Sequence, residues 1–110
     1  MTREITREEI LAMSAGVEMD MLIELELFGK VASVYYHPRP FSTDLSAAWE
    51  VVEKMKQNNW FFILSDNLFP DRWEASFFWD PNQTMIEAIA ETAPLAICRA
   101  ALRVAMEETP

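Results

Sequence analysis

The segment between Tyr35 and Thr43 carries the densest set of side chains able to hold a small ligand. Its aromatic, cationic and hydroxyl-bearing members are Tyr35, Tyr36, His37, Arg39, Phe41, Ser42 and Thr43. Aromatic rings stack on a planar base, and a guanidinium pairs with phosphate. A helix is predicted to begin after Pro40, and its first turn would add free N–H groups and the positive end of the helix dipole. Together these groups suit a small nucleotide.

The same segment also has a purely structural interpretation. Ser42, Thr43 or Asp44 can each cap the helix through a side-chain oxygen, and the aromatic rings can pack against a sheet. Because Pro38 and Pro40 keep the residues before them out of the helical region, the connection is expected to be extended. Both interpretations stay open at this level.

Arg99 and Arg103 form a second candidate binding pair. They lie one turn apart on a helix predicted from Thr92, which is otherwise apolar around most of its circumference. The two guanidinium groups can bind an anionic ligand or line a cleft between subunits. Salt bridging is the alternative. The carboxylates considered as partners are Glu50, Glu53 and Glu107.

Neither a catalytic site nor a metal site is expected. The chain has one histidine, His37, and one cysteine, Cys98, far apart in the sequence, whereas metal sites need clustered ligands. Cys98 falls on an apolar helical stripe, so we expect a small buried residue rather than a nucleophile. A run of acids is expected to form a solvated surface on more than one helix face: Glu18, Asp20, Glu24 and Glu26. We therefore predict a protein that is not an enzyme and has no cofactor.

The composition limits the classes of partner. The 110 residues carry a formal net charge of −9, which disfavours nonspecific binding to nucleic acid or to anionic lipid. No apolar run approaches the length of a membrane span, and the first residues lack the apolar stretch of a signal peptide. The cytoplasm is the expected location.

The first part of the chain predicts two helices. Thr6 and Glu9 form a capping-box pattern that opens a short helix. Residues 17–28 alternate like a strand, but they are strong helix formers and are followed by Gly29, so a helix is predicted. Residues 30–36 can form a short strand or an extended arm.

The remainder predicts a helix, a small sheet and a final helix. Residues 41–56 show a helical apolar stripe. Its members are Leu45, Ala48, Trp49, Val52 and Met55. Residues 60–64 and 72–79 are typical of strands and predict an antiparallel hairpin. Residues 84–90 are undecided by pattern, and as a third strand they would complete a meander. Thr92 begins the last helix.

Two segments closely resemble the signature segments of the phage ABA sandwich domain family. They are FSTDLSAAWEVVEKM at 41–55 and ETAPLAICRAAL at 91–102. Residues 7–20 fit the opening helix of that family as well. The resemblance implies a phage or prophage protein, with residues 1–110 as one α+β domain. It implies a helix–sheet–helix (ABA) sandwich in which helices flank a small three-stranded antiparallel sheet, with 84–90 as its last strand. It implies no reaction.

The aromatic content predicts self-association. Four Trp, seven Phe and seven Met exceed what a small core readily hides. The aromatic residues of the hairpin would occupy both faces of the sheet: Trp60, Phe61, Phe62, Phe77, Phe78 and Trp79. If helices leave one face open, a second subunit is expected to cover it. Full coverage by helices of the same chain is the alternative.

Two functions from different classes follow. The first is a non-enzymatic binding protein, a small phage homo-oligomer that sequesters a nucleotide-like host immune signal as counter-defence. The second is a protein-interaction module that binds a host or phage protein through its acidic or aromatic surface. Neither hypothesis involves nucleic acid or a membrane.

Overall fold

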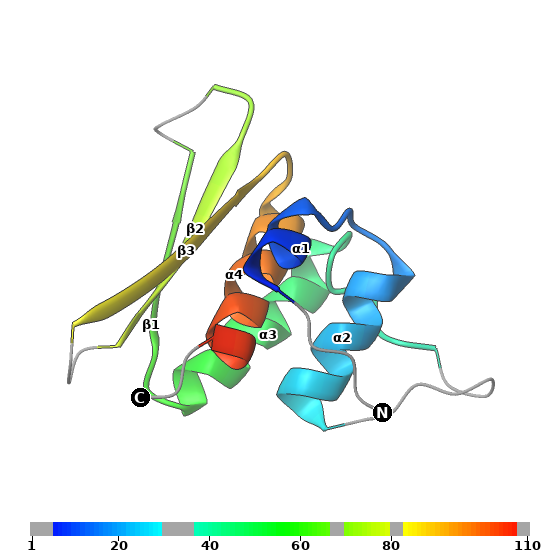
Figure 1. Cartoon of the computed structure of the whole chain (residues 1–110), viewed down its shortest axis with the longest axis horizontal. Coiled ribbons are helices and arrows are strands. Elements are labelled where there is room, and N and C mark those ends of the chain that lie inside the picture. The colour runs from blue at the N-terminus through cyan, green and yellow to red at the C-terminus, as the bar shows by residue number, and fades with distance from the viewer. Residues whose placement is uncertain (1–5, 30–36, 67–69, 80–82, 108–110) are drawn as a thin grey trace.

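The computed structural model describes residues 6–29, 37–66, 70–79 and 83–107. Within these ranges the chain forms helices and strands in the order helix, sheet, helix (Figure 1). The elements are α1 (Arg7–Ala12), α2 (Val17–Phe28), α3 (Leu45–Gln57), β1 (Phe61–Ser65), β2 (Trp73–Trp79), β3 (Thr84–Ala90) and α4 (Ala93–Glu107). The expected strand or arm at 30–36, with Tyr35 and Tyr36, lies outside the described residues.

Local signals set the limits of the first two helices. The Thr6 hydroxyl oxygen accepts a hydrogen bond from the Glu9 backbone, and the Glu9 carboxylate accepts one from the Thr6 backbone, which completes the capping box. Gly29 ends α2 in the left-handed conformation with φ 71°, and its N–H donates to the Leu25 carbonyl. The prediction of a helix over 17–28 is therefore confirmed.

Asp44 is the residue that caps α3. Its carboxylate accepts hydrogen bonds from the backbone N–H groups of Ser46 (2.8 Å) and Ala47 (3.4 Å). Ala48, Val52 and Met55 are buried as predicted. The predicted burial of Leu45 and Trp49 is wrong, because these side chains are 50% and 44% exposed. The core-facing stripe instead includes Ala47 and Val51.

The three strands form an antiparallel meander in the order β1-β2-β3. Phe77 on β2 lies opposite Phe62 on β1 and Ile86 on β3, and Ala75 lies opposite Leu64 and Ala88. These residues share the face of the sheet that packs on the helices. The third strand over 84–90 is therefore confirmed.

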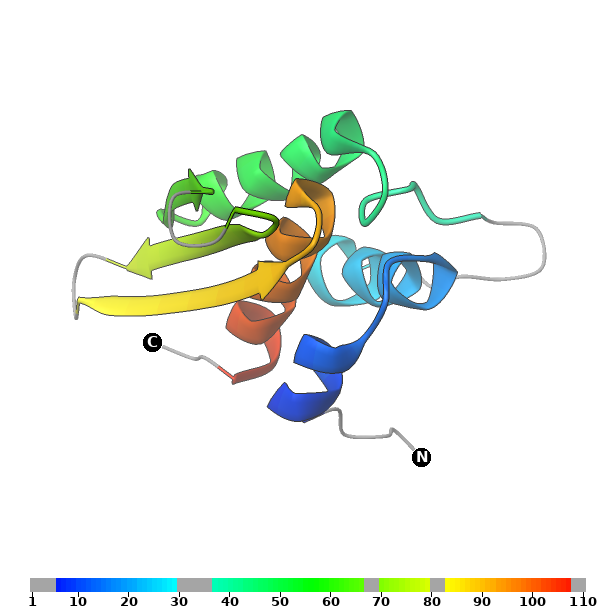
Figure 2. The same ribbon diagram turned by 90° about the horizontal axis from the view of Figure 1, so that it is seen from above.

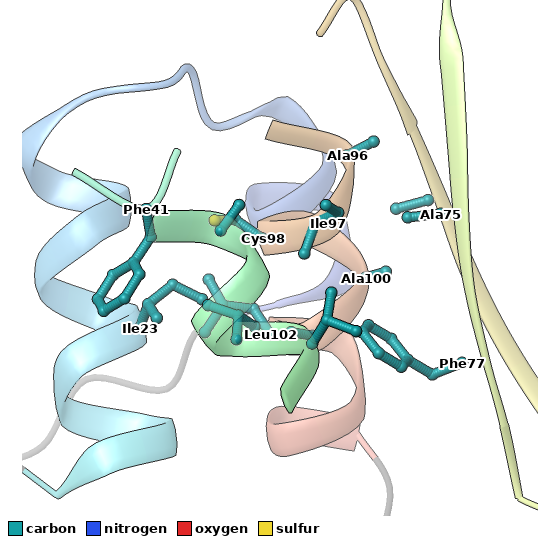
Figure 3. Close-up of a cluster of buried hydrophobic side chains, with 14 of the residues drawn as sticks. Ile23, Phe41, Ala75, Phe77, Ala96, Ile97, Cys98, Ala100 and Leu102 are labelled. Carbon is teal, nitrogen blue, oxygen red and sulfur yellow. The ribbon is translucent and has the colours of Figure 1, made fainter. Parts of the chain in front are cut away.

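Helix α4 lies at the centre of the domain. It packs on β2 and β3 on one side and on α1, α2 and α3 elsewhere (Figures 1 and 2). Figure 3 shows Ile97, Cys98 and Leu102 between Ile23 and Phe41 on one side and Phe77 on the other. The α+β class, with a three-stranded antiparallel sheet flanked by helices, is confirmed, and so is the extensive burial of this last helix.

The helices of the described ranges lie against one face of the sheet, and the opposite face bears exposed apolar residues (Figure 1). Full coverage of the sheet by helices of the same chain is therefore not found there. None of the helices in this part of the chain is long and apolar enough to cross a membrane.

Candidate functional site

Ser42, a predicted ligand residue, is fully buried between the segment before α3 and the start of α2. Its backbone N–H and its hydroxyl both donate to Asp20 Oδ1, at 2.8 and 2.7 Å. Its hydroxyl oxygen also accepts a hydrogen bond from the Gly16 N–H at 2.9 Å. These contacts hold the beginning of α2 against the turn that precedes α3.

Arg39, a second predicted ligand residue, lies over two aromatic rings and beside two carboxylates. The rings of Phe28 and Phe41 stack with centroids 5.4 Å apart, and the Arg39 guanidinium carbon is 4.6 and 4.9 Å from those centroids. Its guanidinium donates to the buried carboxylate of Glu24 and to the exposed carboxylate of Glu50. The cation thus has partners on both α2 and α3.

The acidic residues of α2 therefore divide into two groups. Glu18 and Glu26 are exposed, as predicted for a solvated acidic surface. That prediction is wrong for Asp20 and Glu24, which are 5% and 0% exposed. Their burial is stabilised by hydrogen bonds from Ser42 and Arg39, since a buried charge needs such partners.

The structure places the predicted ligand residues of the 35–43 segment in different surroundings. Phe41 and Ser42 are buried and Arg39 is partly buried, whereas His37 and Thr43 are exposed. Tyr35 and Tyr36 lie outside the described residues. The first turn of α3 already has Asp44 as its cap. Ligand binding by this segment stays a prediction, and among its described residues His37 and Thr43 are exposed.

Arg99 and Arg103 lie along the free edge of β3. Arg99 Nη1 donates to the Ile89 carbonyl at 2.8 Å, and Arg103 Nη1 donates to the Glu87 carbonyl. Arg99 also donates to the carbonyl of Met13, from Nε at 3.2 Å and from Nη2 at 2.9 Å. The rise along the helix over four residues is about 6 Å, which is close to the rise of two residues along a strand, about 6.6 Å. The two arginines therefore occupy successive outward carbonyls of this edge strand.

These contacts correct part of the sequence prediction. Arg99 forms no salt bridge with Glu50 or Glu53 within the described ranges, because its guanidinium is used by backbone carbonyls. Burial lowers the pKa of Arg99, and the charge of Glu91 opposes that shift. Binding of a ligand by this arginine pair stays a prediction.

A groove between α3 and β1 has a volume of about 700 Å³. Its lining residues are Trp49, Val52, Lys56, Asn59, Trp60, Phe61, Phe62 and Trp79. This volume falls within the range of small-molecule pockets, roughly 300–1,000 Å³. The groove forms because β1 is an edge strand and α3 leaves its aromatic residues partly uncovered.

The groove combines flat aromatic surfaces with a cation. Trp49 and Phe62 meet edge to face, with ring centroids 5.7 Å apart, and Trp60 lies 5.3 Å from Trp79. Lys56 is exposed, and within the described residues it forms no salt bridge. The arrangement can hold a planar ring beside an anionic group.

Sequence reasoning missed the groove because it assigned Trp49 to the buried stripe. The available signal was the spacing of Trp49, Val52 and Lys56, which places an aromatic, an aliphatic and a cationic side chain along one helix face. The edge position of β1, which leaves that face open, is a property of the tertiary structure.

The face of the sheet opposite the helices is the other candidate surface, here named the outer face. Its residues are Phe61, Ile63, Ser65, Glu74, Ser76, Phe78, Met85, Glu87 and Ile89. Phe61, Ile63 and Met85 are 61%, 53% and 50% exposed.

Within the described part of the chain, no group of three or more histidine, cysteine or acidic residues lies close enough to hold a metal ion.

Comparisons with known proteins agree with this architecture. Residues 9–102 match the phage ABA sandwich domain. The fold is similar to the 2.0 Å crystal structure of a phage protein from Bacillus cereus ATCC 14579, with a TM-score of 0.66 and 20% sequence identity. That alignment covers 100% of this chain and 96% of the other. No curated protein matches. Since the family match spans most of the sequence, the chain belongs to the phage ABA sandwich domain family.

Proposed function

We propose that this phage protein is a non-enzymatic binding protein that takes up a small nucleotide-like molecule in the groove between α3 and β1. The observation that carries the proposal is the aromatic lining of that groove beside Lys56. A base would stack on Trp49 or Phe62, and a phosphate would pair with the ammonium group of Lys56.

Sequestration of a nucleotide-like host immune signal is the biological role that we attach to this binding. Its support is membership of a phage domain family together with the aromatic groove beside Lys56. A protein of this kind acts as a sink, so it must hold its ligand without turnover. We further propose that it works as a homo-oligomer in the host cytoplasm.

Isothermal titration with a panel of cyclic nucleotides and ADP-ribose derivatives tests the proposal. Trp49→Ala is the main variant, because Trp49 is 44% exposed and its loss leaves the core intact. Base–aromatic stacking contributes about 1–3 kcal/mol, so we expect affinity to fall by roughly 5- to 150-fold. Lys56→Gln should weaken binding of the phosphorylated members of the panel.

Two sets of controls locate the site. Lys54→Gln removes the same charge from α3 outside the groove and should leave affinity unchanged. His37→Ala and Thr43→Ala test the segment predicted from sequence, since both side chains are exposed. If these two variants lose binding while Trp49→Ala keeps it, the ligand occupies that segment and not the groove.

Native mass spectrometry of protein purified from a host without denaturation tests sequestration itself. A retained mass of a few hundred daltons per site, released by organic solvent, is the expected result, and the same spectrum gives the number of subunits. The proposal fails if the protein carries no ligand and the whole panel gives neither heat nor a change in melting temperature.

A further inference from the structure

The outer face of the sheet divides into an apolar end and an acidic part. Phe61, Phe78 and Met85 lie side by side across the three strands in register. Further along, Ile63 lies opposite Ser76, which lies opposite Glu87. The next row contains Ser65, Glu74 and Ile89. Apolar side chains therefore dominate one end of this face, and two carboxyl groups lie towards the other end.

The two carboxyl groups are neighbours on adjacent strands. Burial first, and then the charge and a side-chain hydrogen bond of Glu87, raise the pKa of Glu74. Two carboxylates on neighbouring strands repel each other, so a cation placed beside both would be stabilised by both. The face thus presents a compact negative site next to exposed apolar area.

Two symmetric arrangements of a second copy on this face bring like charges together. If a two-fold axis ran along β2, Glu74 would meet its own counterpart in the other copy. If the axis crossed the strands through Ser76, Glu87 would meet its own counterpart. Either arrangement buries like charges against each other, which is strongly unfavourable.

We infer that the outer face binds a basic amphipathic helix of a partner protein. An apolar face of a sheet is normally buried against another layer of structure. Here α4 covers the face opposite the outer face. A helix laid along β2 would place apolar residues on Phe61, Phe78 and Met85. Lysine or arginine residues further along that helix would lie between Glu74 and Glu87.

The register sets the spacing that such a helix needs. Phe78 and Glu74 lie four residues apart on the same face of β2, about 13 Å along the strand. At 1.5 Å per residue, this distance corresponds to about nine residues of helix. The partner segment therefore has its apolar stripe at one end and its cation about two and a half turns away. This inference does not depend on the ligand proposed for the groove.

Fluorescence anisotropy with a labelled amphipathic helical peptide tests the inference. The probe has leucine on one face and lysine at the spacing above, and its matched control has glutamate in place of each lysine. We expect the lysine peptide to bind, with an affinity that falls as salt is added, and the glutamate peptide not to bind. The double variant Glu74→Gln/Glu87→Gln should weaken binding by about tenfold or more.

A second double variant separates this face from general attraction to an acidic protein. Glu18→Gln/Glu26→Gln removes two exposed charges from α2 and should change the affinity by less than about twofold. Met85→Ser keeps all charges, and its side chain is 50% exposed, so the fold should persist while peptide affinity falls.

Three results would overturn the inference. The first is an absence of binding by the lysine peptide. The second is an equal loss of affinity in the two charge variants, which would mean nonspecific attraction. The third is sedimentation of the wild type as a dimer that Met85→Ser dissociates, because a second copy would then occupy the face.

Discussion

The carboxylate of Glu24 accepts three hydrogen bonds from Arg39, a residue fifteen positions further along the chain. Oε2 accepts from the backbone N–H and from Nε, both at 3.1 Å, and Oε1 accepts from Nη2 at 3.0 Å. Glu24 is fully buried, whereas the Arg39 side chain is 35% exposed. This ion pair fixes the segment before α3 against the middle of α2.

Replacement of Arg39 by alanine is expected to destabilise the protein strongly. The change would remove the two guanidinium donors to the buried carboxylate of Glu24 and keep the backbone N–H of residue 39. Removing one partner of a buried ion pair costs about 3–5 kcal/mol, and the partial exposure of Arg39 lowers our expectation to about 2–3 kcal/mol. Urea unfolding followed by tryptophan fluorescence measures this difference.

Glu50→Gln is the matched control for that variant. It removes the exposed carboxylate on the other side of Arg39 and should cost less than about 1 kcal/mol. Equal costs for the two variants would show that the buried pair does not have the stabilising role assigned to it.

Ser42→Ala is expected to reduce stability by about 1–3 kcal/mol, because the buried carboxylate of Asp20 loses a hydrogen-bond donor. The Gly16 N–H would lose its bond to the Ser42 oxygen, and Asp20 would retain only the backbone N–H of Ser42. Thr43→Ala, at the adjacent exposed position, should have almost no effect. The urea denaturation midpoints of the two variants test this difference. Similar midpoints would contradict a structural role for the Ser42 hydroxyl.

The helices and strands were predictable because their signals are local. The capping box of Thr6 and Glu9 lies within one turn, and Gly29 provides the left-handed residue that ends α2. The sequence pattern did not decide whether residues 84–90 form a strand, and the third strand was predicted from the family resemblance. The meander order then follows from short connections between successive strands.

The surroundings of the candidate sites were not predictable in the same way. In the sequence, Asp20 and Glu24 have the pattern of surface acids. Their burial depends on Ser42 and Arg39, which lie outside their helix. Trp49 has the spacing of a core residue, and its exposure depends on how α3 packs beside the edge strand β1. Which face of a small sheet stays open is likewise decided by how several helices pack.

Glu74→Gln is expected to stabilise the protein at neutral pH and to have little effect in acid. The pKa of Glu74 is raised in the folded state, so protonation of this group favours folding. That favourable contribution is complete below the pKa that Glu74 has in the unfolded chain. It is lost as pH rises through the higher pKa that Glu74 has in the folded protein. A glutamine remains neutral throughout and avoids the loss.

Melting temperatures of the wild type and this variant, measured from weakly acidic to neutral pH, test the sign. The difference should grow as pH rises past the ordinary glutamate pKa. Glu53→Gln removes an exposed charge on α3 and serves as the control for net charge. A difference that is constant with pH, or that grows towards acid, would contradict the coupling between Glu74 and Glu87.

Cys98 is expected to resist thiol reagents in the native protein. It is fully buried on α4, and burial first, then the charge of Asp20, raise the pKa of its thiol. The thiolate is the reactive form, so both access and ionisation oppose modification. Labelling with a chromogenic disulfide should therefore be slow in buffer and fast in urea, with a rate that follows the unfolded fraction. Rapid stoichiometric labelling of the folded protein would mean that the helix containing Cys98 opens readily, and the packing of α4 against α2 and α3 would then need revision.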